Sequence, residues 1–148
     1  MEQMEPILRQ GLETLGLPMD AIPQLQQYAK LLLETNKVMN LTAITEPEEV
    51  ARLHFLDSAA LLLLADFRGK SVVDVGTGAG FPGMPLKILE PTIRMTLLDS
   101  LGKRITFLQE VATTDRSWVI ISIEEPSSRR SLRIMFRTWA WMVTSRAV

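Results

Sequence analysis

The residues best suited to chemistry stand in a glycine-rich turn near the middle of the chain. The segment from Asp74 to Gly83 reads DVGTGAGFPG and contains four glycines. Glycine permits positive φ, so the chain can reverse tightly, and it leaves the backbone N–H groups uncovered for a ligand. A second carboxylate, Asp99, ends the next apolar run, where it could accept both ribose hydroxyls of an adenosine. The pattern therefore predicts a site for a nucleotide-containing cofactor.

Two cofactors fit the spacing of these glycines. The GxGxxG register from Gly78 to Gly83 is the dinucleotide fingerprint and predicts an NAD-dependent oxidoreductase. The GxGxG register that starts at Gly76, after Asp74, suits S-adenosyl-L-methionine. A carboxylate before the glycines favours a sulfonium and an amino group but opposes a pyrophosphate. Pro82 also lacks the N–H that a pyrophosphate would need. We therefore favour S-adenosyl-L-methionine, and NAD stays the alternative.

The elements around the turn predict an α/β fold with a parallel sheet. Short β-branched or apolar runs alternate with helical segments, as in sheets with right-handed crossovers. The expected strands are Ser71–Val75, Ile93–Leu98, Trp118–Ile123 and Trp141–Ser145, and the expected helices are Met84–Leu89 and the segment from Ser100 or Leu101 to Val111.

The first part of the chain predicts helices only. Apolar residues recur at helical spacing from about Met4 to Leu15. A second helix should run from an N-cap at Asp20 to about Glu34, followed by a polar break from Asn36 to Thr42. A capping-box pattern over 45–48 should open a third helix that reaches about Ala65. We expect a helical module over 1–67 and an α/β domain over 68–148.

Composition narrows the class of protein. The chain has 148 residues and no cysteine, which excludes disulfides, thiolate zinc sites and cysteine nucleophiles. Net charge is −1, although residues 101–148 hold 8 Lys/Arg against 4 Asp/Glu. The longest apolar run, 59–65, is too short to cross a bilayer, and the acidic start lacks the pattern of a signal peptide. We expect a cytoplasmic monomer that binds neither membrane nor metal.

Three further motifs strengthen the interpretation of the turn. They are Asn36–Thr42 (NKVMNLT), His54–Ser58 (HFLDS) and Leu98–Arg104 (LDSLGKR). Together with the turn, they make the chain resemble the bacterial 16S rRNA guanine-N7 methyltransferases, the glucose-inhibited division protein B family. The resemblance is dense from about residue 20 to 112. It implies a Rossmann-like S-adenosylmethionine-dependent methyltransferase sheet with a helical N-terminal extension, whose partner is 16S rRNA in the small ribosomal subunit.

The resemblance also implies roles for particular residues. Gly76 and Phe81 should line the cofactor pocket, and the pair 123–124 falls near an adenine-contacting pair. Arg146 matches the arginine at the end of the family's fourth strand and also suits the substrate side. With the glycine turn and the residues expected to hold the adenosine, the predicted cofactor-binding set is Asp74, Gly76, Gly78, Gly80, Phe81, Asp99, Ser100, Leu101, Ile123, Glu124 and Arg146.

The implied reaction asks little of the protein. N7 of guanine already carries an in-plane lone pair, and a sulfonium is a good leaving group. Holding the two in line supplies much of the acceleration. We therefore name no general base and expect no metal.

The later part of the chain departs from the family pattern. Residues 112–141 are unlike it, and 142–146 match again, so we hypothesise a stretch of altered reading frame that the coding DNA would test. About four strands can be placed, whereas the resemblance implies seven. We expect a truncated form with weak or no methyl transfer. The alternative is a fragment that binds cofactor or RNA without turnover.

Several polar residues have structural interpretations. His54, the only histidine, should bond a loop from the α/β part. Asn36, Asn40 and Thr42 should tie down the loop between the two parts through side-chain-to-backbone bonds. Lys103 and Arg104 should be exposed at the start of a helix.

Overall fold

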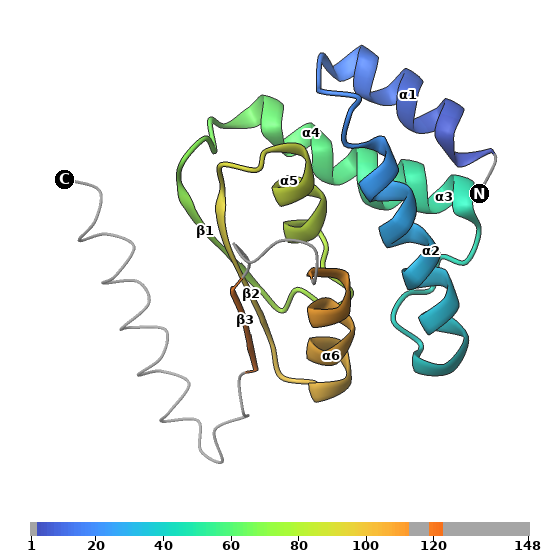
Figure 1. Cartoon of the computed structure of the whole chain (residues 1–148), viewed down its shortest axis with the longest axis vertical. Coiled ribbons are helices and arrows are strands. Elements are labelled where there is room, and N and C mark those ends of the chain that lie inside the picture. Colours follow the sequence, from blue (N-terminus) through green and yellow to red (C-terminus); the bar gives the residue numbers. More distant parts are fainter. Residues whose placement is uncertain (1–2, 113–118, 123–148) are drawn as a thin grey trace.

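The computed structural model describes residues 3–112 and 119–122. Up to residue 64 its regular elements are helices, and from Ser71 onward strands alternate with helices (Figure 1). The helical elements are α1 (Met4–Leu15), α2 (Ile22–Met39), α3 (Pro47–Glu49), the π-helix η1 (Val50–Leu56) and α4 (Asp57–Leu64). The alternating elements are β1 (Ser71–Val75), α5 (Gly83–Leu89), β2 (Arg94–Asp99), α6 (Gly102–Val111) and β3 (Val119–Ser122).

The three described strands form a parallel sheet in the order β1-β2-β3. Val73 pairs with Thr96, and Thr96 pairs in turn with Val119. Helices α5 and α6 lie on the same side of this sheet (Figure 1). The predicted parallel α/β arrangement is confirmed for these strands. The strand predicted at 141–145 lies outside the described residues.

Helix α2 is longer than the sequence predicted, and it begins differently. Ala21 is its N-cap and forms no side-chain cap bond, so the predicted cap at Asp20 is wrong. Pro23 stands in the first turn, where its fixed φ suits a helix start. The helix continues past Glu34 to Met39 because Asn36 is buried on the same side as the apolar stripe. The predicted polar break therefore begins only after Met39.

The third predicted helix exists, but it is composite. Its N-cap is Glu46, which forms no side-chain cap bond, so the predicted capping box does not form. A short α-helical turn passes directly into η1, a π-helix, and then into α4. The apolar pattern does not indicate this widened turn, since both helix types place apolar residues on one side.

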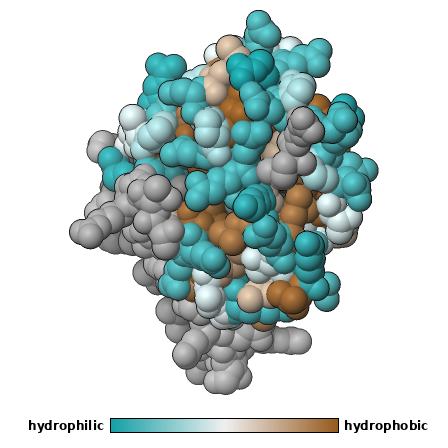
Figure 2. All heavy atoms as spheres, turned by 45° about the vertical axis from the view of Figure 1, so that its right-hand side comes forward, coloured by the Kyte–Doolittle hydropathy of each residue, from teal (hydrophilic) through white to brown (hydrophobic). Residues whose placement is uncertain are grey.

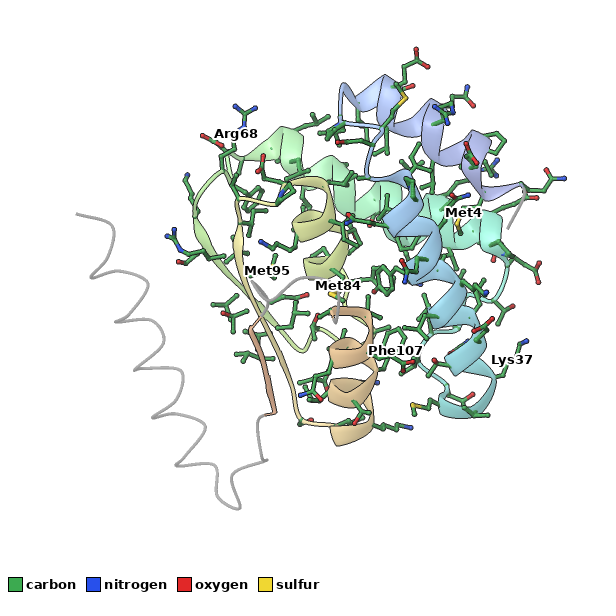
Figure 3. All side chains as sticks on the ribbon, in the orientation of Figure 1. Met4, Lys37, Arg68, Met84, Met95 and Phe107 are labelled. Atoms are coloured by element: carbon green, nitrogen blue, oxygen red, sulfur yellow. The ribbon has the colours of Figure 1, made fainter. Side chains whose placement is uncertain are left out.

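One hydrophobic core runs through both parts of the described chain. It includes Leu8 of α1, Leu32 of α2, Phe55 of η1 and Leu97 of β2. Met84 of α5 and Phe107 of α6 lie between these helices and α2 (Figure 3). The outer surface of the helical side is mainly hydrophilic (Figure 2). The helices of the first part thus cover the α/β part and share its core.

A buried lysine closes the connection from α5 to β2. Lys87 is only 4% exposed, and its Nζ donates hydrogen bonds to the carbonyls of Pro91 (2.6 Å) and Ile93 (2.8 Å). A buried ammonium is tolerated when carbonyl oxygens replace its water. Lys87 thereby fixes the loop that leads into β2.

Candidate functional site

The glycine turn leaves the carboxyl end of β1 and exposes its backbone. Gly76 and Gly78 have φ of +74° and +61°, in the left-handed region. A Cβ placed on either glycine would meet no heavy atom within 4 Å. Bare backbone therefore faces open space here, at the end of the sheet where α/β folds bind ligands.

Gly80 serves a different purpose from the first two glycines. A Cβ at Gly80 would come within 2.5 Å of the Met84 side chain and 2.8 Å of the Tyr28 hydroxyl. Gly80 is buried, and its missing side chain lets the turn pack against α2 and α5. The predicted cofactor-binding glycines thus divide into two that are open and one that is packed.

Asp99 joins the turn to the end of β2. Its carboxylate is 3% exposed and accepts hydrogen bonds from the backbone N–H of Gly78 (2.9 Å) and of Leu101 (2.9 Å). Nη1 of Arg104 lies 3.4 Å from Oδ2 of Asp99. The position predicted from sequence is correct, but the carboxylate is already bonded within the protein.

Asp74 closes the other side of the turn. Its Oδ2 accepts hydrogen bonds from the Thr77 hydroxyl (2.7 Å) and from the backbone N–H of Gly83 (3.0 Å). A Cβ at Gly83 would lie 2.8 Å from that carboxylate oxygen and 2.4 Å from Leu97. One oxygen of Asp74 therefore holds the start of α5 against the sheet.

Tyr28 ties helix α2 to the turn. Its buried hydroxyl donates a hydrogen bond to the carbonyl of Ala79. Burial raises the pKa of Tyr28 well above its ordinary value, and the negative charge of Asp74 adds to the rise. No local pattern in the sequence indicates this contact, because the partner is a backbone atom 51 residues away.

Phe81 lies between two aromatic rings of the helical part. Its ring stacks on His54 at a centroid distance of 4.2 Å and an interplanar angle of 8°. On Tyr28 the distance is 5.4 Å and the angle 23°. Phe81 thus joins the turn to the helices.

His54 makes structural contacts, as expected, but its hydrogen-bonding partner is not the predicted one. Its Nε2 lies 2.9 Å from the Thr42 hydroxyl, in the loop after α2, so the predicted bond to a loop of the α/β part is wrong. The α/β contact is the stacking on Phe81 instead. Partial burial lowers the pKa of His54, and the nearby charge of Asp57 opposes this shift.

Side chains tie down the loop after α2, as predicted for Asn36 and Thr42, although this loop lies within the helical part and not between the two parts. Oδ1 of Asn36 accepts hydrogen bonds from the N–H of Leu41 (2.6 Å) and of Thr42 (2.9 Å), and Nδ2 donates to the Thr42 carbonyl (2.9 Å). The Thr42 hydroxyl accepts from the N–H of Ile44. Asn40 shows no such side-chain bond within the described chain; its backbone ends α2 at a left-handed φ of +48°.

The remaining predicted residues divide between two groups. Ser100 and Leu101 are exposed directly after Asp99, so they share the edge of the sheet with the turn. Lys103 is exposed as predicted and donates to the Met39 carbonyl, whereas Arg104 is half-buried beside Asp99. The predicted residues outside the described range are Ile123, Glu124 and Arg146.

Residues 3–112 and 119–122 contain neither a membrane-spanning helix nor a cluster of metal-binding side chains. No helix in these ranges is long and apolar enough to cross a membrane. Within the same ranges, no group of three or more His, Cys, Asp or Glu side chains could hold a metal ion.

Comparison with known proteins gives one consistent family. The model of rRNA small subunit methyltransferase G, GidB, matches residues 21–134. A protein named "Ribosomal RNA small subunit methyltransferase G" from Lachnoclostridium phytofermentans is 44% identical over 142 residues, which cover 94% of this chain and 59% of the relative. Proteins of the same name from Alkaliphilus metalliredigens and Desulfitobacterium hafniense are 50% and 44% identical over 72% and 87% of this chain. The chain spans about half the length of these curated relatives, 46% and 53% in the last two.

Proposed function

The chain belongs to the rRNA small subunit methyltransferase G family, and on that premise we propose that it binds S-adenosyl-L-methionine at the glycine turn and serves methylation of guanine N7 in 16S rRNA. The observation that carries the proposal is the open backbone at Gly76 and Gly78. The space that a Cβ would enter at these positions is free of protein atoms, and a cofactor can occupy it. The relatives' shared name favours methyl transfer over the oxidoreductase alternative.

In this proposal the turn and the end of β2 hold the cofactor. Gly76 and Gly78 present backbone to it, and Ser100 and Leu101 flank its adenosine. Asp99 keeps the turn and the β2 end in fixed relation through its bonds to Gly78 and Leu101. Ile123, Glu124 and Arg146 belong to the proposed site by resemblance alone.

The chemistry needs orientation more than proton transfer. Bound S-adenosyl-L-methionine supplies a methyl group on a sulfonium, which is a good leaving group. The chain's own residues bind and orient, and fixed positioning of reactants is worth a large rate factor. The proposal includes no general base and no metal. The proposed setting is a cytoplasmic monomer acting on the small ribosomal subunit.

Calorimetry tests the cofactor. Titrating the purified chain with S-adenosyl-L-methionine should give saturable heat, and titrating it with NAD should give none. Saturable binding of NAD, with none of S-adenosyl-L-methionine, would support the oxidoreductase alternative and reject the methyl donor.

A transfer assay tests the reaction. The chain is incubated with methyl-labelled S-adenosyl-L-methionine and with small subunits that lack N7-methylguanine. Label at guanine N7 above the protein-free control supports the proposed reaction. Cofactor binding with no transfer at all would contradict the reaction and support a binding protein without turnover.

A further inference from the structure

A cavity of about 410 Å³ lies beside the glycine turn, and Phe81 is the one lining residue that it shares with the predicted cofactor-binding set. Phe81 and Pro82 of the turn form one wall. Leu53 and His54 of η1 and Asp57 of α4 form the adjoining wall. The volume falls within the range of about 300–1,000 Å³ that is typical of small-molecule sites.

Asp57 differs from the two carboxylates of the turn. Asp74 and Asp99 both accept hydrogen bonds from the protein. Asp57 is exposed, and its carboxylate forms no hydrogen bond or ion pair with the described part of the chain. Its lone pairs are therefore available to a ligand in the cavity.

The backbone that forms this wall is itself unusual. The π-helix η1 carries Leu53 and His54 and ends immediately before Asp57. π-Helical turns are rare and occur frequently at functional sites. The widened turn places residues of η1 and of α4 around one cavity.

His54 makes the wall rigid. One face of its ring stacks on Phe81, and its Nε2 contacts the Thr42 hydroxyl. Among residues 3–112 and 119–122, its Nδ1 has no hydrogen-bonding partner. A fixed aromatic ring with one free nitrogen beside a free carboxylate suits a flat, polar-edged ligand.

We propose that this cavity receives the guanine base to be methylated, flipped out of the RNA, and that Asp57 accepts hydrogen bonds from its N1–H and N2 amino group. The proposal rests on the proposed function of the chain. Enzymes that modify bases commonly read the flipped base through its Watson–Crick edge.

The chemistry of the two purines gives the cavity its expected selectivity. Guanine presents two donors, N1–H and the N2 amino group, which a carboxylate can accept together. Adenine presents an acceptor at N1, which a carboxylate repels. N7 lies on the far side of the purine from N1 and N2, so binding by Asp57 leaves it free to react.

Titration with mononucleotides tests the site. The ¹⁵N-labelled chain, with S-adenosyl-L-methionine present, is titrated with guanosine 5′-monophosphate or adenosine 5′-monophosphate and followed by NMR. Guanosine 5′-monophosphate should shift the amides of residues 54–61 and of Phe81, and it should bind more tightly than the adenine nucleotide. Asp57→Asn should weaken its binding about tenfold, the usual scale for one bidentate base contact.

Two further variants sharpen the result. Asp20→Asn removes the same charge from an exposed residue outside the cavity and should leave binding unchanged. Ala60→Leu adds bulk to the lining of the cavity and should block both nucleotides. The dispersion of each variant's spectrum shows that it is folded before it is titrated.

Any of three results would overturn the proposal. They are equal binding of the two nucleotides, shifts confined to other residues, and an Asp57→Asn variant that binds like the parent. Titrating S-adenosyl-L-methionine into separate, cofactor-free samples of the same proteins distinguishes the two proposals. Cofactor binding without guanine preference rejects the base cavity alone, whereas absence of cofactor binding contradicts the proposed function.

Discussion

At the scale of single residues, the glycines of the turn differ in what they permit. Gly78 and Gly69 have nearly the same φ, +61° and +66°, and a Cβ on either would meet open space. Only Gly78 lies in the turn, where its N–H bonds Asp99. Comparing alanine variants of these two glycines therefore separates the destabilisation caused by a left-handed backbone from the loss of affinity caused by a side chain in the ligand site.

Gly78→Ala and Gly69→Ala should each destabilise the fold by about 1–2 kcal/mol, because an L-residue is strained at positive φ. Gly78→Ala alone should weaken the binding of S-adenosyl-L-methionine, by about tenfold or more, which corresponds to about 1.4 kcal/mol. Denaturant unfolding and calorimetry measure the two effects. Equal affinities in the two variants would mean that the cofactor does not lie against Gly78.

His54 predicts a pH dependence of stability. Its folded pKa lies below the usual value of 6.5, so the unfolded chain binds the proton more readily. Stability should therefore be complete above pH 6.5 and fall as pH decreases through 6.5 toward the lower folded pKa. The free energy of unfolding, measured in urea across this window, checks the sign.

His54→Phe keeps an aromatic ring on Phe81 but cannot titrate. The chain has one histidine, so the free energy of unfolding of this variant should no longer decrease between about pH 7 and pH 5.5. This window lies above the range where carboxylates titrate. A variant with the same decrease as the parent would assign the pH dependence to other groups.

At the scale of elements, helix α2 supports the turn that it packs against. Tyr28→Phe preserves the stacking on Phe81 but leaves the buried carbonyl of Ala79 without its donor. An unsatisfied buried acceptor costs about 1–3 kcal/mol, so unfolding should become easier by that amount. Affinity for S-adenosyl-L-methionine should fall as well, because the turn is less firmly held.

Thr14→Ala is the control for Tyr28→Phe. It also removes a hydroxyl that donates to a backbone carbonyl, but on the exposed surface of α1. Water replaces that bond, so stability and affinity should both stay within error of the parent. An unchanged affinity in Tyr28→Phe would show that the turn keeps its shape without α2.

The elements that the sequence predicted well are those with local signals. The β-branched run before Gly76 and the glycines after it identify β1 and its turn, whatever the remainder of the chain does. The π-helix and the last turn of α2 have no such local pattern. Asn36 is a residue type that is typical of a break between helices. Its side chain nevertheless accepts hydrogen bonds from the N–H groups of Leu41 and Thr42 and extends the helix.

The places of Asp74 and Asp99 in the fold were predictable from the sequence, but their hydrogen-bonding partners were not. Spacing alone places Asp74 and Asp99 at the carboxyl ends of neighbouring strands. It does not show that both carboxylates bond the turn itself, because those donors are backbone N–H groups of Gly78 and Gly83. Tyr28 and His54 reach the turn only through contacts between distant segments.

At the scale of the whole molecule, the shared core predicts one cooperative unit. Phe55 is 1% exposed in η1, and its ring contacts those of Tyr28 and Phe81. Phe55→Ala should destabilise the fold by about 3–5 kcal/mol. Amide exchange in β1 and β2 should accelerate together with exchange in α2, because the two parts lose the same support.

Val38→Ala is the matched control, since Val38 is 81% exposed on α2. It should change the free energy of unfolding by no more than about 0.5 kcal/mol. The exchange rates should stay correspondingly close to those of the parent. If Phe55→Ala accelerated exchange in the helices alone, the two parts would unfold independently.

The buried ammonium of Lys87 makes this residue an internal reporter of unfolding. Acylating reagents need a free amine, and the amine of Lys87 is enclosed by the carbonyls of Pro91 and Ile93. Under native conditions the exposed Lys37 and Lys103 should react quickly, whereas Lys87 should react only at the rate at which the fold opens. Peptide mass spectrometry after timed acetylation measures both rates, and equally fast labelling at all three lysines would mean that the α5–β2 connection opens freely.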